Sequence, residues 1–288
     1  MNKLLIFFLL IGSGHLNGRA ESHLKQKEKT VLYGFQQSTP IPVTFKYYDY
    51  SITELPIEDL PYMDGKSELR MIYQYTKEGV PYHTFGTQTN FHSVFIAQYA
   101  LKKIDILYTT GDTSIISNLK AVADKMISIA EKKNNTYCFP YIFDFPLHAM
   151  KDQMMVAPWY SGMSQGQLLS FFVRLFVITG ESKYLNAARQ VYNSFCRYEA
   201  EGVYPWYSTV DPKGNLWLEE YPMSPNCYTL NGMIFTIYGL YDYYLVTKNP
   251  TCKLLLQATI STIHNRIDEF RNKGDLSYYC LKHKVKDL

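Results

Sequence analysis

The sequence predicts an all-α fold: an α/α toroid in which helical hairpins form an incomplete (α/α)4 barrel, preceded by a short arm that contains β-strands. The first observation is a repeat, because Thr110, Thr179 and Thr247 each separate two long apolar segments and lie 69 and then 68 residues apart. The second is the pattern inside each repeat. One segment is apolar on nearly all sides and the next keeps one polar face, as expected of an inner and an outer helix.

Residues 1–20 are predicted to be a secretory signal peptide. Lys3 precedes an apolar run that ends at Ile11, and Ala20 closes a stretch of small residues. The run is too short to span a bilayer. We therefore expect a protein of the secretory pathway, periplasmic or secreted, or of the Golgi lumen in a eukaryote. After signal cleavage no membrane association is expected, and a short N-terminal anchor is the alternative.

Residues 21–78 are predicted to form an extended arm or the remnant of a small β element. Strand-like pieces at 44–50 and 69–75 are separated by turns at Leu55-Pro56 and Asp64-Gly65. The segment is too short and irregular for a core of its own. Residues 79–288 are then one helical domain.

Each repeat in that domain predicts an inner helix, an outer helix and an irregular connection with β-like pieces. The inner helices are expected at 91–108, 164–178 and 228–246, the outer helices at 113–132, 182–198 and 251–271, and the β-like pieces at 137–143 and 203–208. Because the inner helices of a toroid start on one rim, the motifs that precede them should meet at one mouth. Those motifs are residues 80–88, 158–167 and 218–222, with a fourth at 276–283.

Composition narrows the classes of function. A net charge of +3 without a basic block gives little support for nucleic-acid binding, while 47% hydrophobic residues are ample for a core. The five cysteines lack CxxC spacing and the histidines His83, His92 and His148 lack HxxxH spacing, so no metal site is expected. No nicotinamide motif is present, and we predict no cofactor.

Several motifs in one order resemble the C-terminal domain of the heparan sulfate/heparosan D-glucuronyl C5-epimerase family. They are FIAQYAL (95–101), WYSGMSQGQ (159–167), EEYP (219–222), LNG (230–232), GLYD (239–242) and YCLKH (279–283). The resemblance covers about Gly79 to His283 and implies an α/α toroid. It also implies an isomerase that acts on an acidic polysaccharide of the glycosaminoglycan type and converts D-glucuronate to L-iduronate units. A homodimer is compatible with this reading.

Three departures from the family pattern are visible. Only about 60 residues stand where the family has β-rich domains, no helical pair follows the last motif, and that motif carries Cys280 and Lys282 in place of an aspartate and an arginine. Two alternatives therefore stay open. One is a catalytically impaired glycan-binding or partner protein of the same fold, and the other is a different α/α-toroid polysaccharide lyase or hydrolase.

Inversion of carbon five requires two acid/base groups on opposite faces of the sugar and a cation or donors on the carboxylate. The resemblance assigns Glu220, Tyr221 and Tyr279 to the reacting centre and Lys282 to the substrate carboxylate. A tyrosine base would need a nearby cation to lower its pKa from about 10, and Lys282 or Arg174 could supply it.

The remaining substrate-binding candidates come from the second rim motif. Trp159 and Tyr160 could stack on sugar rings, and Gln165 and Gln167 could bind sugar hydroxyls. Structural readings compete with these roles: packing on the rim for the two aromatic residues, and capping of the inner helix for the two glutamines. Glu219 and Glu220 could likewise be solvated loop carboxylates, and Gly232 a point of close helix contact.

Overall fold

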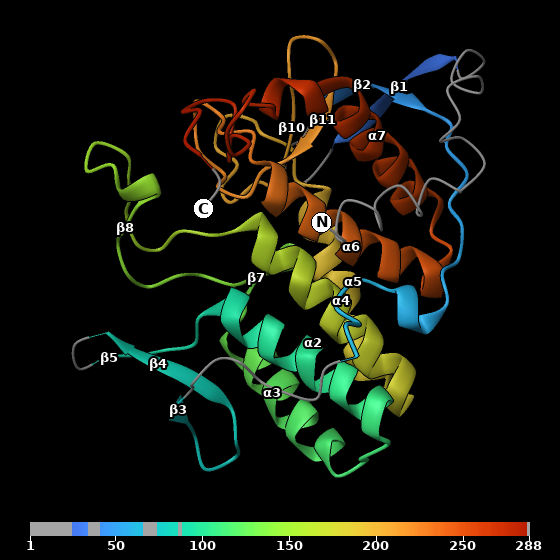
Figure 1. Cartoon of the computed structure of the whole chain (residues 1–288), viewed down its shortest axis with the longest axis vertical. Helices are drawn as coiled ribbons and strands as arrows, with labels where there is room; N and C mark the ends of the chain where they lie inside the picture. Colours follow the sequence, from blue (N-terminus) through green and yellow to red (C-terminus); the bar gives the residue numbers. More distant parts are fainter. Residues whose placement is uncertain (1–24, 34–40, 66–73, 86–87, 287–288) are drawn as a thin grey trace.

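Three helical hairpins dominate the computed structural model, which describes residues 25–33, 41–65, 74–85 and 88–286 (Figure 1). The predicted signal peptide at 1–20 lies outside the described residues, as does most of the strand predicted at 69–75. Among the described helices, none combines the length and apolar character that a membrane crossing requires.

The six predicted helices are confirmed, with ends that differ from the predictions by a few residues. They are α2 (Ser93–Thr110), α3 (Ile115–Ile129), α4 (Gly162–Thr179), α5 (Ser182–Phe195), α6 (Leu230–Thr247) and α7 (Pro250–Arg266). A short 3₁₀ turn, η4 (Ile267–Phe270), extends the last of them.

The threonine that marks each repeat is the last residue of an inner helix. Thr110, Thr179 and Thr247 each donate a hydrogen bond of 2.7 Å from Oγ1 to the carbonyl four residues back. Each Oγ1 also accepts from the backbone N–H two residues ahead, at 3.2 or 3.3 Å. The next residue is left-handed, with φ of 72° at Gly111 and 71° at Gly180, which ends the helix. The feature that repeats in the sequence is therefore the C-terminal end of each inner helix.

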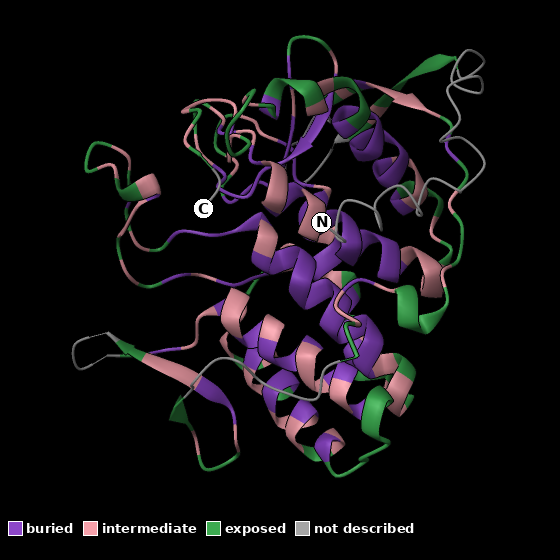
Figure 2. Cartoon of the chain, in the orientation of Figure 1, coloured by how far each residue is buried: buried purple, intermediate pink, exposed green. Residues whose placement is uncertain are grey.

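The inner helices α2, α4 and α6 pack in a row, with α4 in contact with both of the others. Helix α4 is buried along almost its whole length (Figure 2). The outer helices α3, α5 and α7 each pack against the inner helix that precedes them. A helix buried on several sides explains the all-round apolar pattern of the inner segments.

Glycines bring α4 and α6 unusually close together. A methyl group on Gly239 would lie 2.1 Å from the carbonyl oxygen of Gly166, and one on Gly166 would lie 2.4 Å from the Cα of Thr236. The backbones therefore touch with no side chain between them, and Thr236 Oγ1 donates to the carbonyl of Gly162 at 3.0 Å. This contact fixes the relative position of the two inner helices.

Small antiparallel sheets accompany the helices, so the all-α expectation is too narrow. In the arm, β1 (Gln26–Tyr33) pairs with β2 (Ile41–Tyr48), and β2 packs on α7 through a 2.7 Å hydrogen bond from Tyr48 N to Ser261 Oγ. The sequence predicted most of β2 but missed β1, whose charged half does not look like a strand. The other strands are β3 (Gln74–Tyr75), β4 (Pro81–Phe85), β5 (Gln88–Asn90), β6 (Glu131–Lys133), β7 (Thr136–Cys138), β8 (Phe145–Pro146), β9 (Met154–Met155), β10 (Ser208–Val210) and β11 (Leu216–Leu218).

The glycine contact gives a stability prediction. Gly239→Ala should lower the free energy of unfolding by about 1–3 kcal/mol, because the new methyl group meets backbone that cannot move aside without separating α4 from α6. Urea denaturation followed by circular dichroism measures the change. Ser117→Thr, which adds one methyl group to an exposed position of α3, should stay within about 0.5 kcal/mol of the wild type. Equal effects of the two substitutions would contradict the close contact.

Candidate active site

The loops that lead into α4 and α6 meet, as predicted, at one end of the inner helices. Ser161 caps α4 by accepting from Ser164 N, and Gly162 N donates to the carbonyl of Glu220 at 2.9 Å. The fourth motif joins them, because Leu230 N at the start of α6 donates to the carbonyl of Tyr279 at 3.3 Å. Three segments far apart in sequence therefore share one mouth.

The first rim motif lies apart from this mouth. Its described part forms β4 and the start of β5 in a hairpin that stands out from the helices (Figure 1). Its contact with the helical body includes the edge of the His83 ring against Phe95, with 5.0 Å between ring centroids. The predicted convergence is confirmed for the second, third and fourth motifs only.

Glu220, Tyr221 and Tyr279, the three predicted catalytic residues, lie together. Tyr279 Oη donates to Glu220 Oε2 at 2.8 Å, and the two phenol oxygens lie 3.4 Å apart. Since the Tyr279 proton goes to the carboxylate, Tyr221 is the donor in the longer contact. The three groups form one hydrogen-bonded cluster, because the Tyr221 phenol also interacts with Glu220. Glu220 is only 4% exposed, so it is not a solvated loop carboxylate.

Gly232 makes room for this carboxylate. A methyl group there would lie 2.5 Å from both Cβ and Oε2 of Glu220. The prediction that Gly232 allows a close contact is therefore right, but the group that approaches α6 is the acidic side chain rather than another helix. The neighbouring Asn231 side chain bonds to the Tyr279 phenol.

Both site tyrosines are neutral proton donors at physiological pH. Burial raises the pKa of Tyr221 and of Tyr279 well above the ordinary value of 10, and the negative charge of Glu220 raises both further. The expected tyrosine base, activated by a cation, is therefore wrong for this arrangement. The group able to accept a proton is the carboxylate.

Glu219 has a separate, structural role. It is fully buried, and both its oxygens accept from the backbone N–H of Tyr228, at 3.1 and 3.2 Å. Burial raises its pKa from 4.5 to about 8, with additional contributions from the charges of Glu199 and Glu220. At neutral pH Glu219 is mostly protonated, and the adjacent acids do not share the site as two full charges.

Aromatic rings form one wall of the mouth. Trp159 stacks on Tyr141 with 4.0 Å between ring centroids, and it packs against Phe145 and Tyr221 at 5.4 and 6.4 Å. Its indole N–H donates to the carbonyl of Phe143 at 2.7 Å. Trp159 is only 5% exposed. It therefore supports the rings beside Tyr221, in agreement with the packing alternative.

Lys282 has an ammonium group that is bound only to neutral acceptors among its described contacts. It donates to Gln153 Oε1 at 3.3 Å and to the carbonyl of Pro225 at 3.2 Å. Its backbone N–H donates to the carbonyl of Cys227, next to the loop that carries Glu219 and Glu220. A cation with weak neutral partners at the mouth is suited to a substrate carboxylate.

Arg174 does not reach the site. It lies in the core, near the far end of α4, about 18 Å along the helix axis from Gly162. Its guanidinium forms a two-point ion pair with Asp242 of α6, at 2.7 and 3.3 Å, and lies over the Tyr62 ring. The expectation that Arg174 binds substrate or activates a tyrosine is corrected: Arg174 joins the two inner helices.

Tyr160, Gln165 and Gln167 also face the core instead of the mouth. Tyr160 Oη donates to Glu131 at 2.6 Å, and Gln165 Nε2 donates to the Tyr137 carbonyl and to Ser194, both at 2.8 Å. Gln167 is fully buried in the middle of α4. The α4 cap is Ser161, so the capping alternative for the glutamines is wrong as well.

The sequence interpretation missed Tyr141 and Asn231. Burial raises the pKa of Tyr141 and the Glu220 charge acts in the same direction, while Tyr141 Oη accepts from Val94 N at 3.2 Å. This contact ties the start of α2 to the aromatic wall. Tyr141 lies within the β-like piece predicted at 137–143, and Asn231 lies within the LNG motif. The sequence analysis therefore included both residues but did not predict their contacts with the site.

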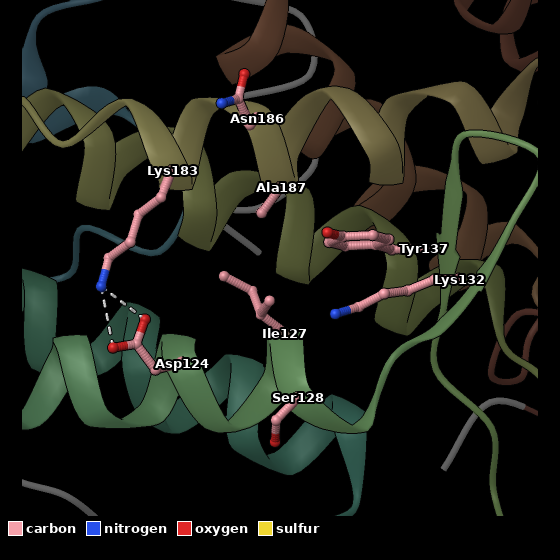
Figure 3. Close-up of a pocket in the computed structure, with 8 residues that line it drawn as sticks. All are labelled: Asp124, Ile127, Ser128, Lys132, Tyr137, Lys183, Asn186 and Ala187. Carbon is pink, nitrogen blue, oxygen red and sulfur yellow. Dashed lines mark hydrogen bonds and ion pairs between the residues drawn. The ribbon is translucent and has the colours of Figure 1, made fainter.

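A surface groove of about 560 Å³ lies elsewhere, between α3 and α5 (Figure 3). Lys183 on its rim pairs with Asp124, and Lys132 lies over the Tyr137 ring at 5.3 Å. Its charges are paired within the protein, and none of the predicted site residues lines it. The groove is a gap between outer helices.

Comparison with known proteins identifies a family for the chain. A family model described as the D-glucuronyl C5-epimerase C-terminus matches residues 133–287. The D-glucuronyl C5-epimerase of Caenorhabditis elegans is 32% identical over 123 residues, which cover 42% of this chain and 18% of that protein. An uncharacterized protein of Methanocaldococcus jannaschii is 27% identical over 168 residues, covering 56% and 53%. The chain thus spans less than one fifth of the worm enzyme and about half of the archaeal protein.

Similar solved structures are more distant. A protein of Listeria innocua is 14% identical with a TM-score of 0.45, covering 64% of this chain and 48% of its own. A glycoside hydrolase family 76 mannosidase of Bacteroides thetaiotaomicron is 16% identical with a TM-score of 0.47, covering 75% and 55%.

The raised pKa of Glu219 predicts how stability depends on pH. An acid with a raised pKa binds its proton more tightly in the folded protein, so its contribution is complete below pH 4.5 and is lost as the pH rises through about 8. Relative to Glu219→Gln, the wild type should lose up to about 1.4 kcal/mol of unfolding free energy per pH unit in this window. Urea denaturation at several pH values measures it, with Glu201→Gln at an exposed position as control. Parallel curves for all three proteins would contradict the assignment.

Proposed function

The chain belongs to the D-glucuronyl C5-epimerase C-terminus family, and from this premise we propose that it inverts carbon five of D-glucuronate units in an acidic polysaccharide. The observation that carries the proposal is the hydrogen-bonded cluster of Tyr221, Tyr279 and Glu220. It joins a buried carboxylate, which can take a proton, to two neutral phenols, which can give one. Such a set meets the need for an acid and a base without a cofactor.

We propose that the sugar ring enters between the phenols of Tyr221 and Tyr279, where the 3.4 Å contact is longer and weaker than the 2.8 Å bond from Tyr279 to Glu220. Glu220, held by Tyr279, then removes the proton from carbon five on one face. Charge moves onto the substrate carboxylate, which Lys282 stabilises. Tyr221 delivers a proton to the opposite face of carbon five, and its phenolate is reprotonated from Glu220 through Tyr279 once the product has left.

We further propose that the helical hairpins are part of an α/α toroid. The row of inner helices with outer partners and the clustering of the loops at one end support this arrangement. In such a fold the mouth at that end would open toward a polymer that passes across it.

Exchange of the hydrogen at carbon five tests the reaction. The full chain, incubated in deuterium oxide with a glucuronate polymer, should introduce deuterium at carbon five. Glu220→Gln and Tyr279→Phe should slow exchange roughly 100- to 10,000-fold, because each removes one proton-transfer group. Mass spectrometry of the released disaccharides measures it. Tyr204→Phe, at a half-exposed ring away from the mouth, serves as the control with unchanged exchange.

Other outcomes of that experiment distinguish the alternatives. Binding of the polymer without exchange at carbon five would favour a glycan-binding protein of the same family. New unsaturated or reducing ends would instead show a lyase or a hydrolase. Either result would overturn the proposed epimerisation.

Lys282 should act on both substrate binding and the reaction step. Lys282→Met should raise KM for the polymer about 10- to 100-fold, the range expected for a lost hydrogen bond to a charged group, and should also lower kcat, because charge builds up on the bound carboxylate as the proton leaves. Lys282→Arg should restore most of the affinity, because its guanidinium also binds a carboxylate. Steady-state exchange kinetics separate the two constants. An unchanged KM for Lys282→Met would remove Lys282 from the substrate site.

A further inference from the structure

Three side chains with metal-binding atoms meet behind Tyr279. Cys280 Sγ lies 3.3 Å from His148 Nε2 and 3.4 Å from His283 Nδ1, and the three ligand atoms lie within 4.8 Å of one another. In a tetrahedral zinc site with Zn–S of about 2.3 Å and Zn–N of about 2.0–2.1 Å, neighbouring ligand atoms lie about 3.4–3.6 Å apart. The two sulfur-to-nitrogen distances are close to that geometry, and the two ring nitrogens, which lie within 4.8 Å of each other, would move closer together to share one ion.

The backbone around the sulfur is arranged to hold a negative charge. His283 N donates to Cys280 Sγ at 3.4 Å within the tight turn that joins the two residues. A cation would complete the stabilisation of the thiolate that this donor begins.

Each imidazole presents one ring nitrogen to the sulfur, Nε2 from His148 and Nδ1 from His283. His148 has φ of 55° and ψ of 27°, a left-handed conformation that few residues other than glycine adopt. Side chains held in such conformations are typical of sites with a specific role.

Hydrogen bonding alone satisfies the cluster poorly. One thiol proton can serve a single imidazole nitrogen, whereas one cation would bind the sulfur and both nitrogens at once. The ammonium of the neighbouring Lys282 forms its own hydrogen bonds to Gln153 and to the carbonyl of Pro225. We propose that His148, Cys280 and His283 bind one divalent cation of the zinc class, with a fourth position open to water.

Such an ion would position Tyr279. It would tie the short turn η3 (Leu147–Ala149) to the turn after Tyr279, whose phenol donates to Glu220. The His148 ring already meets the Tyr279 ring edge-on, with centroids 5.3 Å apart. The metal site itself does not depend on the proposed epimerisation, because its ligands and its spectroscopic signature are separate from the polymer.

Cobalt substitution tests the site directly. Titration of the full chain with Co²⁺ should give one bound ion per chain, with a thiolate-to-metal charge-transfer band and visible bands of tetrahedral intensity. Zn²⁺ should displace it and abolish both. Cys280→Ser should remove the charge-transfer band, and His283→Gln should weaken binding by more than roughly 100-fold, since even residues that only support a ligand cost roughly 10- to 100-fold.

Matched controls are available elsewhere in the chain. Cys196→Ser and His264→Gln change a free cysteine and an exposed histidine outside the cluster, and both should bind Co²⁺ as the wild type does. Circular dichroism checks that each variant is folded. Absence of the thiolate band in the wild-type protein would overturn the proposal whatever the variants do, as would equal binding by the wild type and folded Cys280→Ser. Metal binding without exchange at carbon five would leave this site standing and count only against the proposed epimerisation.

Discussion

The close approach of α4 and α6 is the constraint on which the rest of the molecule depends. Gly166 and Gly239 let the two backbones touch, and Gly162, one turn earlier, lies against the carbonyl of Glu219. On α6, Gly232 lies against the Glu220 side chain. The glycines that pack the helices therefore also seat the acidic loop across the starts of both. The position of the carboxylates follows from helix packing, so the site is built on rigid elements even though its residues lie in loops.

The helical part of the fold was predictable because its signals are local. The Thr-Gly stop is a hydrogen-bond pattern within a few residues, and an inner helix buried on several sides is apolar all round whatever its neighbours are. The small sheets were less predictable. Strand β1 has a charged half and is held by pairing with β2, and the pairing of β10 with β11 lies beyond most of the predicted piece at 203–208. Their stability comes from pairing and packing that no short window of sequence contains.

The sequence predicted the site residues that belong to a family motif. It did not predict the direction in which other side chains point. Glu220, Tyr221 and Tyr279 came from the family pattern, and the structure brings them together. Arg174 was predicted at the site because of its charge alone, and in the structure it forms an ion pair with Asp242 in the core. The absence of CxxC and HxxxH spacing argued against a metal site, whereas the fold brings His148 to Cys280 from 132 residues away in the sequence. The CxxH turn contains two of the three proposed ligands, Cys280 and His283, and the fold brings His148 beside them.

Glu219 and Glu220 are adjacent acids in one buried loop, and the structure gives their side chains different partners. Two ionised carboxylates so close together in an apolar surrounding would repel strongly. Burial raises the pKa of Glu219 to about 8 against the opposite effect of its backbone hydrogen bond, whereas Glu220 accepts from the Tyr279 phenol. A protonated Glu219 places no second negative charge beside Glu220. In the proposed reaction, the buried Glu219 thus spares the base from like-charge repulsion.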